Sequence, residues 1–141
     1  MLNISVITVT LNAESTICDC LKSVHNQTDV TTQHIIVDGN STDGTMQLLA
    51  EYSSYLDEIV SETDQGIYYA MNKGLEIAEG DVVGILNADD FYGDSLVLQR
   101  VANSFETRSV DCCYGDLVYV NEFSPELIVR YWKSGHFDRR R

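Results

Sequence analysis

Residues 82–86 form an apolar run (VVGIL) that stops abruptly at Asn87, Ala88, Asp89 and Asp90. A short apolar run of this kind is typical of a strand that is buried on both faces. Ligands of open α/β sheets bind just beyond the carboxyl ends of the strands. Two adjacent carboxylates there repel each other unless a cation or a proton intervenes. The stretch therefore predicts either a site for Mg²⁺ or Mn²⁺, or a helix cap followed by a solvated turn.

The rest of the chain alternates predicted strands with predicted helices. Apolar, β-branched runs predict strands over residues 4–11, 34–37, 58–62 and 82–86. Apolar residues at helical spacing predict helices over 14–26, 43–52 and 67–78, and a fourth helix from about residue 94. Residues 110–120 and 127–132 predict a hairpin with its turn at 121–125. This order predicts an α/β fold with a mostly parallel sheet and a C-terminal β-hairpin, and 141 residues predict a single domain.

Polar side chains gather where the first four predicted strands end. Parallel strands bring their carboxyl ends to the same edge of the sheet, so these residues are expected around one crevice. Clustered carboxylates cost stability unless the protein uses them, which favours a functional site over a series of unrelated caps. The residues are Thr8, Thr10, Asn12, Asp38, Glu62, Asp64, Asn87, Asp89 and Asp90.

Several classes of function are disfavoured. A net charge of −13 argues against nucleic-acid binding, which needs a basic patch. The segment after the first strand has no glycine, so it is neither a dinucleotide fingerprint nor a P-loop. None of His25, His34 and His136 is expected near the crevice, which disfavours nucleophilic catalysis. What remains is a metal-dependent nucleotide site, in which Asp38 accepts from a base or ribose and Asp89 holds the metal.

Neither a leader nor a membrane-spanning segment is recognisable in these residues. The first apolar run is short and has no basic region before it, and no run reaches about 18 apolar residues. The four cysteines lack zinc-ligand spacing and are expected to be free thiols of a cytosolic protein. We therefore expect a cytoplasmic location, with the inner face of the membrane as an alternative.

Four ordered motifs closely resemble family 2 glycosyltransferases of the GT-A fold, most strongly the bacterial enzymes of surface-polysaccharide assembly. They are residues 4–12 (ISVITVTLN), 37–45 (VDGNSTDGT), 64–74 (DQGIYYAMNKG) and 86–90 (LNADD). The resemblance implies a GT-A (Rossmann-like) sheet, a nucleotide-sugar donor (most often a uridine diphosphate sugar), and inversion at the anomeric carbon. It also implies a glycan or lipid-linked acceptor and a Mn²⁺ or Mg²⁺ cofactor.

The resemblance also implies roles for individual residues. Asn87, Ala88 and Asp89 match the Asp-x-Asp metal motif with Asn in the first place, which leaves Asp89 and then Asp90 as metal ligands and Asn87 as a ribose contact. The nucleotide-binding set implied by position is Thr8, Thr10, Asn12, Glu14, Asp38, Asp64, Asn72, Lys73 and Asn87.

Members of this family usually run well past 141 residues, and their second half supplies much of the acceptor site and the catalytic base. We therefore expect residues 1–141 to be one donor-binding domain without its acceptor half, with Asp116 and Asp138 as weak candidates for the base. The basic C-terminus predicts either contact with an anionic acceptor or membrane face, or a solvated tail. Apolar surface left open by a missing half would promote a homodimer. Two other functions stay open, a donor-binding module without transferase activity and a nucleotidyltransferase.

Overall fold

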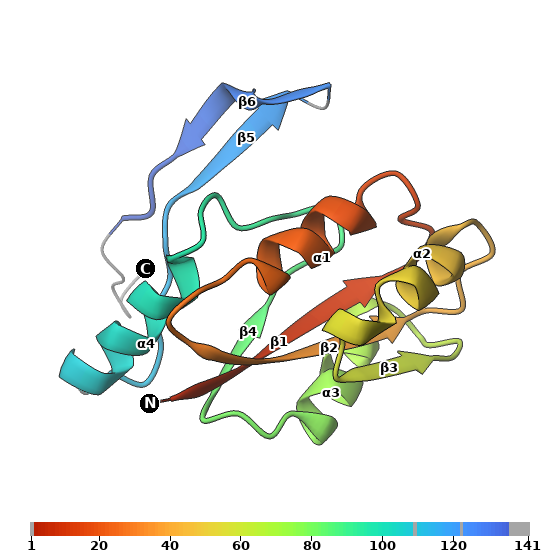
Figure 1. Cartoon of the computed structure of the whole chain (residues 1–141), viewed down its shortest axis with the longest axis horizontal. Helices are drawn as coiled ribbons and strands as arrows, with labels where there is room; N and C mark the ends of the chain where they lie inside the picture. The colour runs from red at the N-terminus through yellow and green to blue at the C-terminus, as the bar shows by residue number, and fades with distance from the viewer. Residues whose placement is uncertain (1, 109, 122, 136–141) are drawn as a thin grey trace.

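The computed structural model describes residues 2–108, 110–121 and 123–135. Strands and helices alternate through the first two thirds of the chain, as the sequence predicts (Figure 1). The elements are β1 (Asn3–Thr10), α1 (Ile17–His25), β2 (Thr31–Asp38), α2 (Thr45–Glu51), the short 3₁₀ helix η1 (Ser53–Tyr55), β3 (Glu58–Ser61), α3 (Ile67–Ile77), β4 (Val82–Ile85), α4 (Val97–Arg108), β5 (Leu117–Asn121) and β6 (Ser124–Trp132).

The first four strands form a parallel sheet in the order β3-β2-β1-β4. β1 lies inside this sheet, where Ile4 pairs with Thr32 of β2 and with Val82 of β4. Because β1 has neighbours on both edges and helices over both faces, residues 4–10 are all buried. The parallel pairing brings the carboxyl ends of the strands to one edge of the sheet, and the predicted α/β fold is confirmed.

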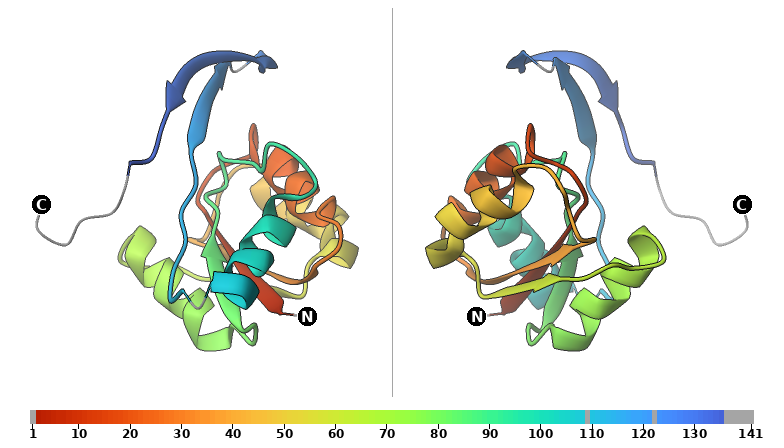
Figure 2. Two further views of the ribbon diagram at one scale, coloured as in Figure 1. Left: turned by 90° about the vertical axis from the view of Figure 1, so that its left-hand side faces the viewer. Right: turned by 90° about the vertical axis from the view of Figure 1, so that its right-hand side faces the viewer.

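Successive side chains of β1 point to opposite faces of the sheet and build two layers of helices. Ile4 and Val6 pack with residues of α1 and α4, whereas Ile7 and Val9 pack with α3. Figure 2 shows α1, α2 and α4 on one side of the sheet and α3 on the other. α3 approaches the sheet closely at Gly74, where an added Cβ would overlap the Ile7 side chain.

β4 differs from its prediction. Residues 82–86 were expected to be buried on both faces, but β4 pairs only with β1 and forms an edge of the described four-stranded sheet. Val83 and Ile85 are 39% and 47% exposed, so one face of the strand is open. The apolar residues on both faces of the strand predicted that both faces would be buried, but the described residues cover only one of them.

The hairpin of β5 and β6 forms its own two-stranded sheet and stands away from the rest of the molecule (Figures 1 and 2). Its first strand starts at Leu117, later than the predicted residue 110, and its second starts at Ser124 and contains Pro125, which was expected in the turn. Proline lacks an N–H, and a two-stranded ribbon with open outer edges tolerates that loss. Among the described residues, no helix is long and apolar enough to cross a membrane.

Candidate functional site

A cavity of about 490 Å³ opens at the carboxyl edge of the sheet, between the loop after β1, the start of α3 and the turn after β4. Five of the predicted site residues come together in its wall: Thr10, Asn12, Asp64, Asn87 and Asp89. The remaining wall is formed by Val9, Leu11, Ala13, Ser15, Thr16, Gly39, Gly66, Ile67, Ala70 and Ala88.

Two polar atoms of this wall are buried without a hydrogen-bond partner among the described residues, Thr10 Oγ1 and Asn87 Oδ1. Leaving such an atom unpaired costs about 1–3 kcal/mol, so native proteins seldom do so without a reason. Thr10 ends β1 and Asn87 follows β4, so the two atoms belong to neighbouring strands. A ligand that contacted these atoms would supply the missing partners.

The turn after β4 carries Asp89 and Asp90 on its exposed side. The Asp90 N–H donates to the Asn87 carbonyl oxygen at 3.0 Å, which holds the turn tight. The Asp90 carboxyl is partly withdrawn from water, and this desolvation, followed by the neighbouring Asp89 charge, raises the pKa of Asp90 above its ordinary value. The Asp89 contribution is a repulsion between two neighbouring carboxylates, and a divalent cation bound between them would relieve it.

The donor set fits Mg²⁺ or Mn²⁺ only in part. No group of three His, Cys, Asp or Glu side chains that could hold a metal occurs within residues 2–108, 110–121 and 123–135. Mg²⁺ in proteins is commonly held by one or two carboxylates together with substrate phosphates. Asp89 and Asp90 match that pattern, with a diphosphate needed to complete the coordination.

Asp38 was predicted to bind the nucleotide base, but its buried carboxylate already accepts several hydrogen bonds from the protein. Ser41 donates to it through both its backbone N–H, at 3.0 Å, and its hydroxyl, and the Ser61 hydroxyl donates at 2.7 Å. The residue is fully buried and absent from the cavity wall. In this structure Asp38 therefore ties β2, β3 and the loop after β2 together beneath the site.

Asn12 and Glu14 join the loop after β1 to the loop after β2. The Asn12 side-chain oxygen accepts from the Thr42 N–H at 2.9 Å, and the backbone N–H of Asn12 donates to Ser41 Oγ at 2.8 Å. The Glu14 carboxylate accepts from the Gly44 N–H at 3.0 Å, and Glu14 lies outside the cavity wall. Asn12 has a φ of 52°, a left-handed conformation that asparagine tolerates better than most residues.

Thr8 is also fully buried, and it lies in a chain of polar groups behind the cavity. Its hydroxyl is 3.0 Å from His34 Nε2 and 3.7 Å from Cys20 Sγ. Burial lowers the pKa of His34 to about 4 and raises the pKa of Cys20 to about 12. At neutral pH the imidazole is therefore uncharged and the Cys20 thiol keeps the proton with which it bonds the Asn87 carbonyl oxygen.

Asn72 and Lys73 lie on α3, outside the cavity wall. The Lys73 ammonium pairs with Glu62 at 2.9 Å. Asp64 accepts from the Gly66 N–H at 2.9 Å, in a turn at the start of α3 where Gly66 has a φ of 122°. That turn places Gly66 and Ile67 in the wall, and the Asp-x-Gly spacing at the start of the 64–74 motif was its signal in the sequence.

Of the two candidate bases, Asp116 belongs to the hairpin and Asp138 lies outside the described residues. The Asp116 carboxylate accepts from the Tyr131 hydroxyl at 2.6 Å and from the Ser134 N–H at 2.8 Å. These hydrogen bonds, that of Tyr131 above all, hold the pKa of Asp116 below its ordinary value. A base needs a higher pKa to take a proton near neutrality, so this arrangement favours a structural role.

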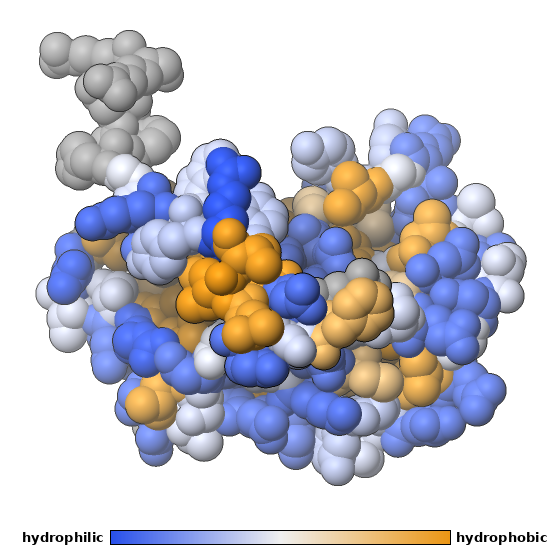
Figure 3. All heavy atoms as spheres, turned by 90° about the horizontal axis from the view of Figure 1, so that it is seen from above, coloured by the Kyte–Doolittle hydropathy of each residue, from blue (hydrophilic) through white to orange (hydrophobic). Residues whose placement is uncertain are grey.

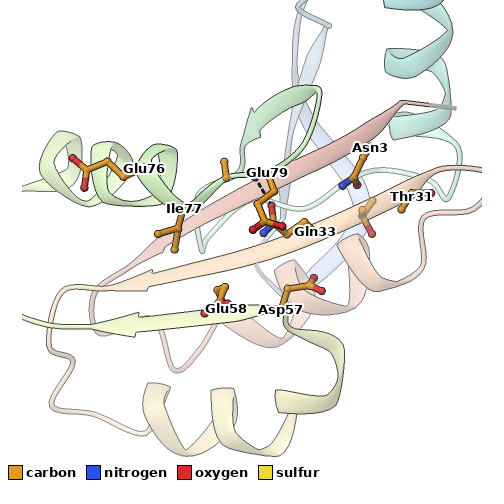
Figure 4. Close-up of a pocket in the computed structure, with 10 residues that line it drawn as sticks. Asn3, Thr31, Gln33, Asp57, Glu58, Glu76, Ile77 and Glu79 are labelled. Carbon is orange, nitrogen blue, oxygen red and sulfur yellow. Dashed lines mark hydrogen bonds between the residues drawn. The ribbon is translucent and has the colours of Figure 1, made fainter.

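A second cavity, of about 770 Å³, lies at the opposite edge of the sheet (Figure 4). Its wall includes Asp57, Glu58, Glu76 and Glu79, and the Glu79 N–H donates to the Gln33 side chain at 2.9 Å. Although this cavity is the larger, it lies at the amino ends of the strands, away from the edge at which open α/β sheets bind ligands. We therefore take the cavity at the carboxyl edge as the candidate functional site.

Two solved structures similar to this chain contain a bound nucleotide sugar. Residues covering 77% of this chain superpose with a TM-score of 0.71 and 28% identity on 32% of Staphylococcus aureus TarS 1-349, solved in complex with UDP-GlcNAc. A mannosyltransferase from Pyrobaculum calidifontis, solved in complex with GDP-Man and Mn²⁺, matches 84% of this chain with a TM-score of 0.70 and 25% identity over 35% of its own length. These neighbours confirm the GT-A fold.

The profile of the family described as glycosyl transferase family 2 matches residues 5–141, and the chain belongs to that family. A PGL/p-HBAD biosynthesis glycosyltransferase of Mycobacterium tuberculosis is 37% identical over 118 residues, which cover 81% of this chain and 46% of the relative. A putative teichuronic acid biosynthesis glycosyltransferase of Bacillus subtilis is 41% identical over 91 residues, 62% of this chain and 36% of the relative. The chain thus spans less than half the length of these curated relatives.

Proposed function

We propose that this chain binds the donor of a glycosyltransferase that moves a sugar from a nucleoside diphosphate sugar, in the first place a uridine diphosphate sugar, to a glycan or lipid-linked acceptor. The observation that carries the proposal is the pair of unpartnered buried atoms, Thr10 Oγ1 and Asn87 Oδ1, in the same wall as Asp89. A nucleoside offers hydroxyl and amide groups to such atoms, and its diphosphate carries the charge that a carboxylate-bound cation neutralises.

In the proposed site, different residues of the cavity wall bind different parts of the donor. Thr10, Asn12 and Asp64 receive the nucleoside, and Asn87 contacts the ribose. Asp89, with Asp90 beside it, holds Mn²⁺ or Mg²⁺. When bound, the metal stabilises the charge that develops on the departing diphosphate. Thr8 and Asp38, whose polar groups already have protein partners, support the wall from behind.

In the proposed reaction an acceptor hydroxyl attacks the anomeric carbon as the bond to the diphosphate breaks, so the configuration inverts. A general base must take the hydroxyl proton. Asp116 has a lowered pKa and two hydrogen-bond donors, so it is poorly suited to that task. This observation favours a second candidate function, in which the chain by itself binds the donor without transferring the sugar.

Isothermal titration with UDP and Mn²⁺ tests donor binding. We expect a saturable heat that requires both ligands, and its loss in Asp89→Ala. Asp111→Ala is the matched control, because Asp111 is an exposed carboxylate outside the cavity wall. Unchanged UDP binding by Asp89→Ala would remove Asp89 from the site. Sugar release from UDP-GlcNAc, with and without a glycan acceptor, then separates a transferase from a donor-binding module.

A further inference from the structure

The hairpin carries an aromatic and cationic face that the donor site does not use. Leu117 pairs with Trp132 and Tyr119 pairs with Arg130 across the antiparallel ladder. Cross-strand partners share a face, and so do residues two apart along a strand, so these four side chains form one surface. Leu117, Tyr119 and Trp132 are 48%, 46% and 49% exposed.

Arg130 lies between the two aromatic rings of this surface. Its guanidinium carbon is 5.6 Å from the centroid of Tyr119 and 5.2 Å from that of Trp132. The ion pairs found within the described parts of the chain join Lys73 to Glu62 and Arg100 to Asp94, so no carboxylate there neutralises Arg130. Stacking orders the guanidinium while its N–H groups remain able to bind an anion.

The distribution of charge along the chain also favours an anion at the hairpin over one at the body. Residues 2–108 carry four Lys and Arg against 17 Asp and Glu, whereas the described residues from 110 on carry two, Arg130 and Lys133, against three, Asp111, Asp116 and Glu126. A polyanion is therefore repelled strongly by the body and much less by the hairpin, where Arg130 is the cation of this face. Figures 1 and 2 place the hairpin beyond the loop that follows the carboxyl end of β4, the strand that leads to Asp89.

We propose that the face formed by Leu117, Tyr119, Arg130 and Trp132 binds a glycan chain bearing carboxylate or phosphate groups. Sugar rings present C–H faces that stack on Tyr119 and Trp132, and the planar guanidinium of Arg130 matches a carboxylate or phosphate with two parallel hydrogen bonds. Read with the proposed function, on which this assignment rests, the face is a subsite for an anionic acceptor. Other apolar side chains of the hairpin, Leu127, Ile128 and Val129, are also 57–63% exposed. Figure 3 shows an apolar patch on the side of the molecule seen from above.

Trp132 is the only tryptophan of the chain, so intrinsic fluorescence reports on this face directly. We would titrate the protein with an oligogalacturonate and, separately, with a neutral maltooligosaccharide of the same length. The expected result is a saturable change in Trp132 emission with the anionic oligomer, weakened by added salt, and a much smaller response to the neutral one. Arg130→Gln should lower the affinity for the anionic oligomer by about tenfold. Arg108→Gln, a matched change on α4, should not.

Circular dichroism establishes that each variant is folded, and Arg130→Lys, which keeps the charge but loses the planar fork, should bind with intermediate affinity. Equal responses to both oligomers, or equal binding by Arg130→Gln and the parent, would overturn the proposal. A Trp132 response seen only with phosphatidylglycerol vesicles would also overturn it. A Trp132 signal that changes with protein concentration would do the same, because it would mean that a second copy of the chain covers the face. Asp89→Ala should bind the oligomer normally, so failure of donor binding and failure of this face are distinguishable.

Discussion

The Cys20 thiol on α1 lies 3.6 Å from the Asn87 carbonyl oxygen and donates a hydrogen bond to it. The same carbonyl accepts from the Asp90 N–H at 3.0 Å. One backbone oxygen therefore joins the helix behind the sheet to the turn that carries the proposed metal ligands. Because burial keeps the pKa of Cys20 near 12, this donor is present throughout the neutral range.

Cys20→Ala removes that donor, and we expect a loss of about 1 kcal/mol in the free energy of unfolding together with weaker Mn²⁺ binding in the presence of UDP. Cys20→Ser keeps a donor and should recover much of the Mn²⁺ affinity, even if its stability falls. Urea denaturation and isothermal titration give the two quantities. Cys18→Ala on the same helix is the control. Identical Mn²⁺ affinities for the Ala and Ser variants would exclude a positioning role for the thiol.

His34 predicts a specific dependence of stability on pH. Its pKa is about 4 in the folded protein and 6.5 without burial, so between these values the unfolded chain takes up a proton that the folded chain does not. The contribution of neutral His34 to the free energy of unfolding is fully present above pH 6.5 and is lost as the pH falls towards 4. The loss approaches about 3 kcal/mol.

His34→Gln should therefore flatten the curve of unfolding free energy against pH between 6.5 and 4. His25→Gln should leave the curve unchanged, because His25 is exposed and stacks on Tyr55 at the surface. Urea denaturation at several pH values, followed by circular dichroism, measures both curves. Parallel curves for His34→Gln and the parent would contradict the assignment.

Asp38→Asn tests whether the buried carboxylate supports the fold. An amide offers a single acceptor oxygen to the Ser41 N–H and to the Ser41 and Ser61 hydroxyls, so we expect a loss of about 2 kcal/mol in stability. Asp111→Asn changes an exposed carboxylate and should be neutral. A stable Asp38→Asn protein that no longer binds UDP would instead return Asp38 to the nucleotide-binding residues.

Gly74→Ala tests the close approach of α3 to the sheet. Alanine favours a helix by about 1 kcal/mol over glycine, but its Cβ would overlap the Ile7 side chain. We expect the overlap to prevail and to cost about 1–3 kcal/mol net, measured as a lower melting temperature. Gly93→Ala places a Cβ where no heavy atom lies within 4 Å, so it should melt close to the parent.

The sequence predicted the sheet, and the gathering of polar residues at its carboxyl edge, because both follow from local patterns. The β-branched run of β1, the Asp38 and Asp89 strand ends and the helical spacing of Leu21 and Val24 are each readable without tertiary information. These patterns alone predicted a metal-dependent nucleotide site, and the motifs of the glycosyltransferase family narrowed that prediction to a nucleotide sugar.

What the sequence did not reveal depends on contacts between distant residues. Ser61 bonds Asp38 across 23 positions of the sequence, and Thr8 bonds His34 across 26. The sequence alone therefore could not show that Asp38 and Thr8 lie behind the cavity wall and not in it. The open face of β4 was missed for a related reason. Val83 and Ile85 encode an apolar face, and only the described sheet order shows that nothing covers it there.

The pairing of β1 with β4 has a consequence for synthesis on the ribosome. Ile4 lies beside Val82, so the first strand to emerge waits for almost eighty further residues before its second edge is paired. Contacts that span such separations form late, because the chain entropy of closing the loop is lost before the pairing stabilises it. The turn with Asp89 follows β4 directly, so the nascent chain has no complete cavity until its fourth strand has docked.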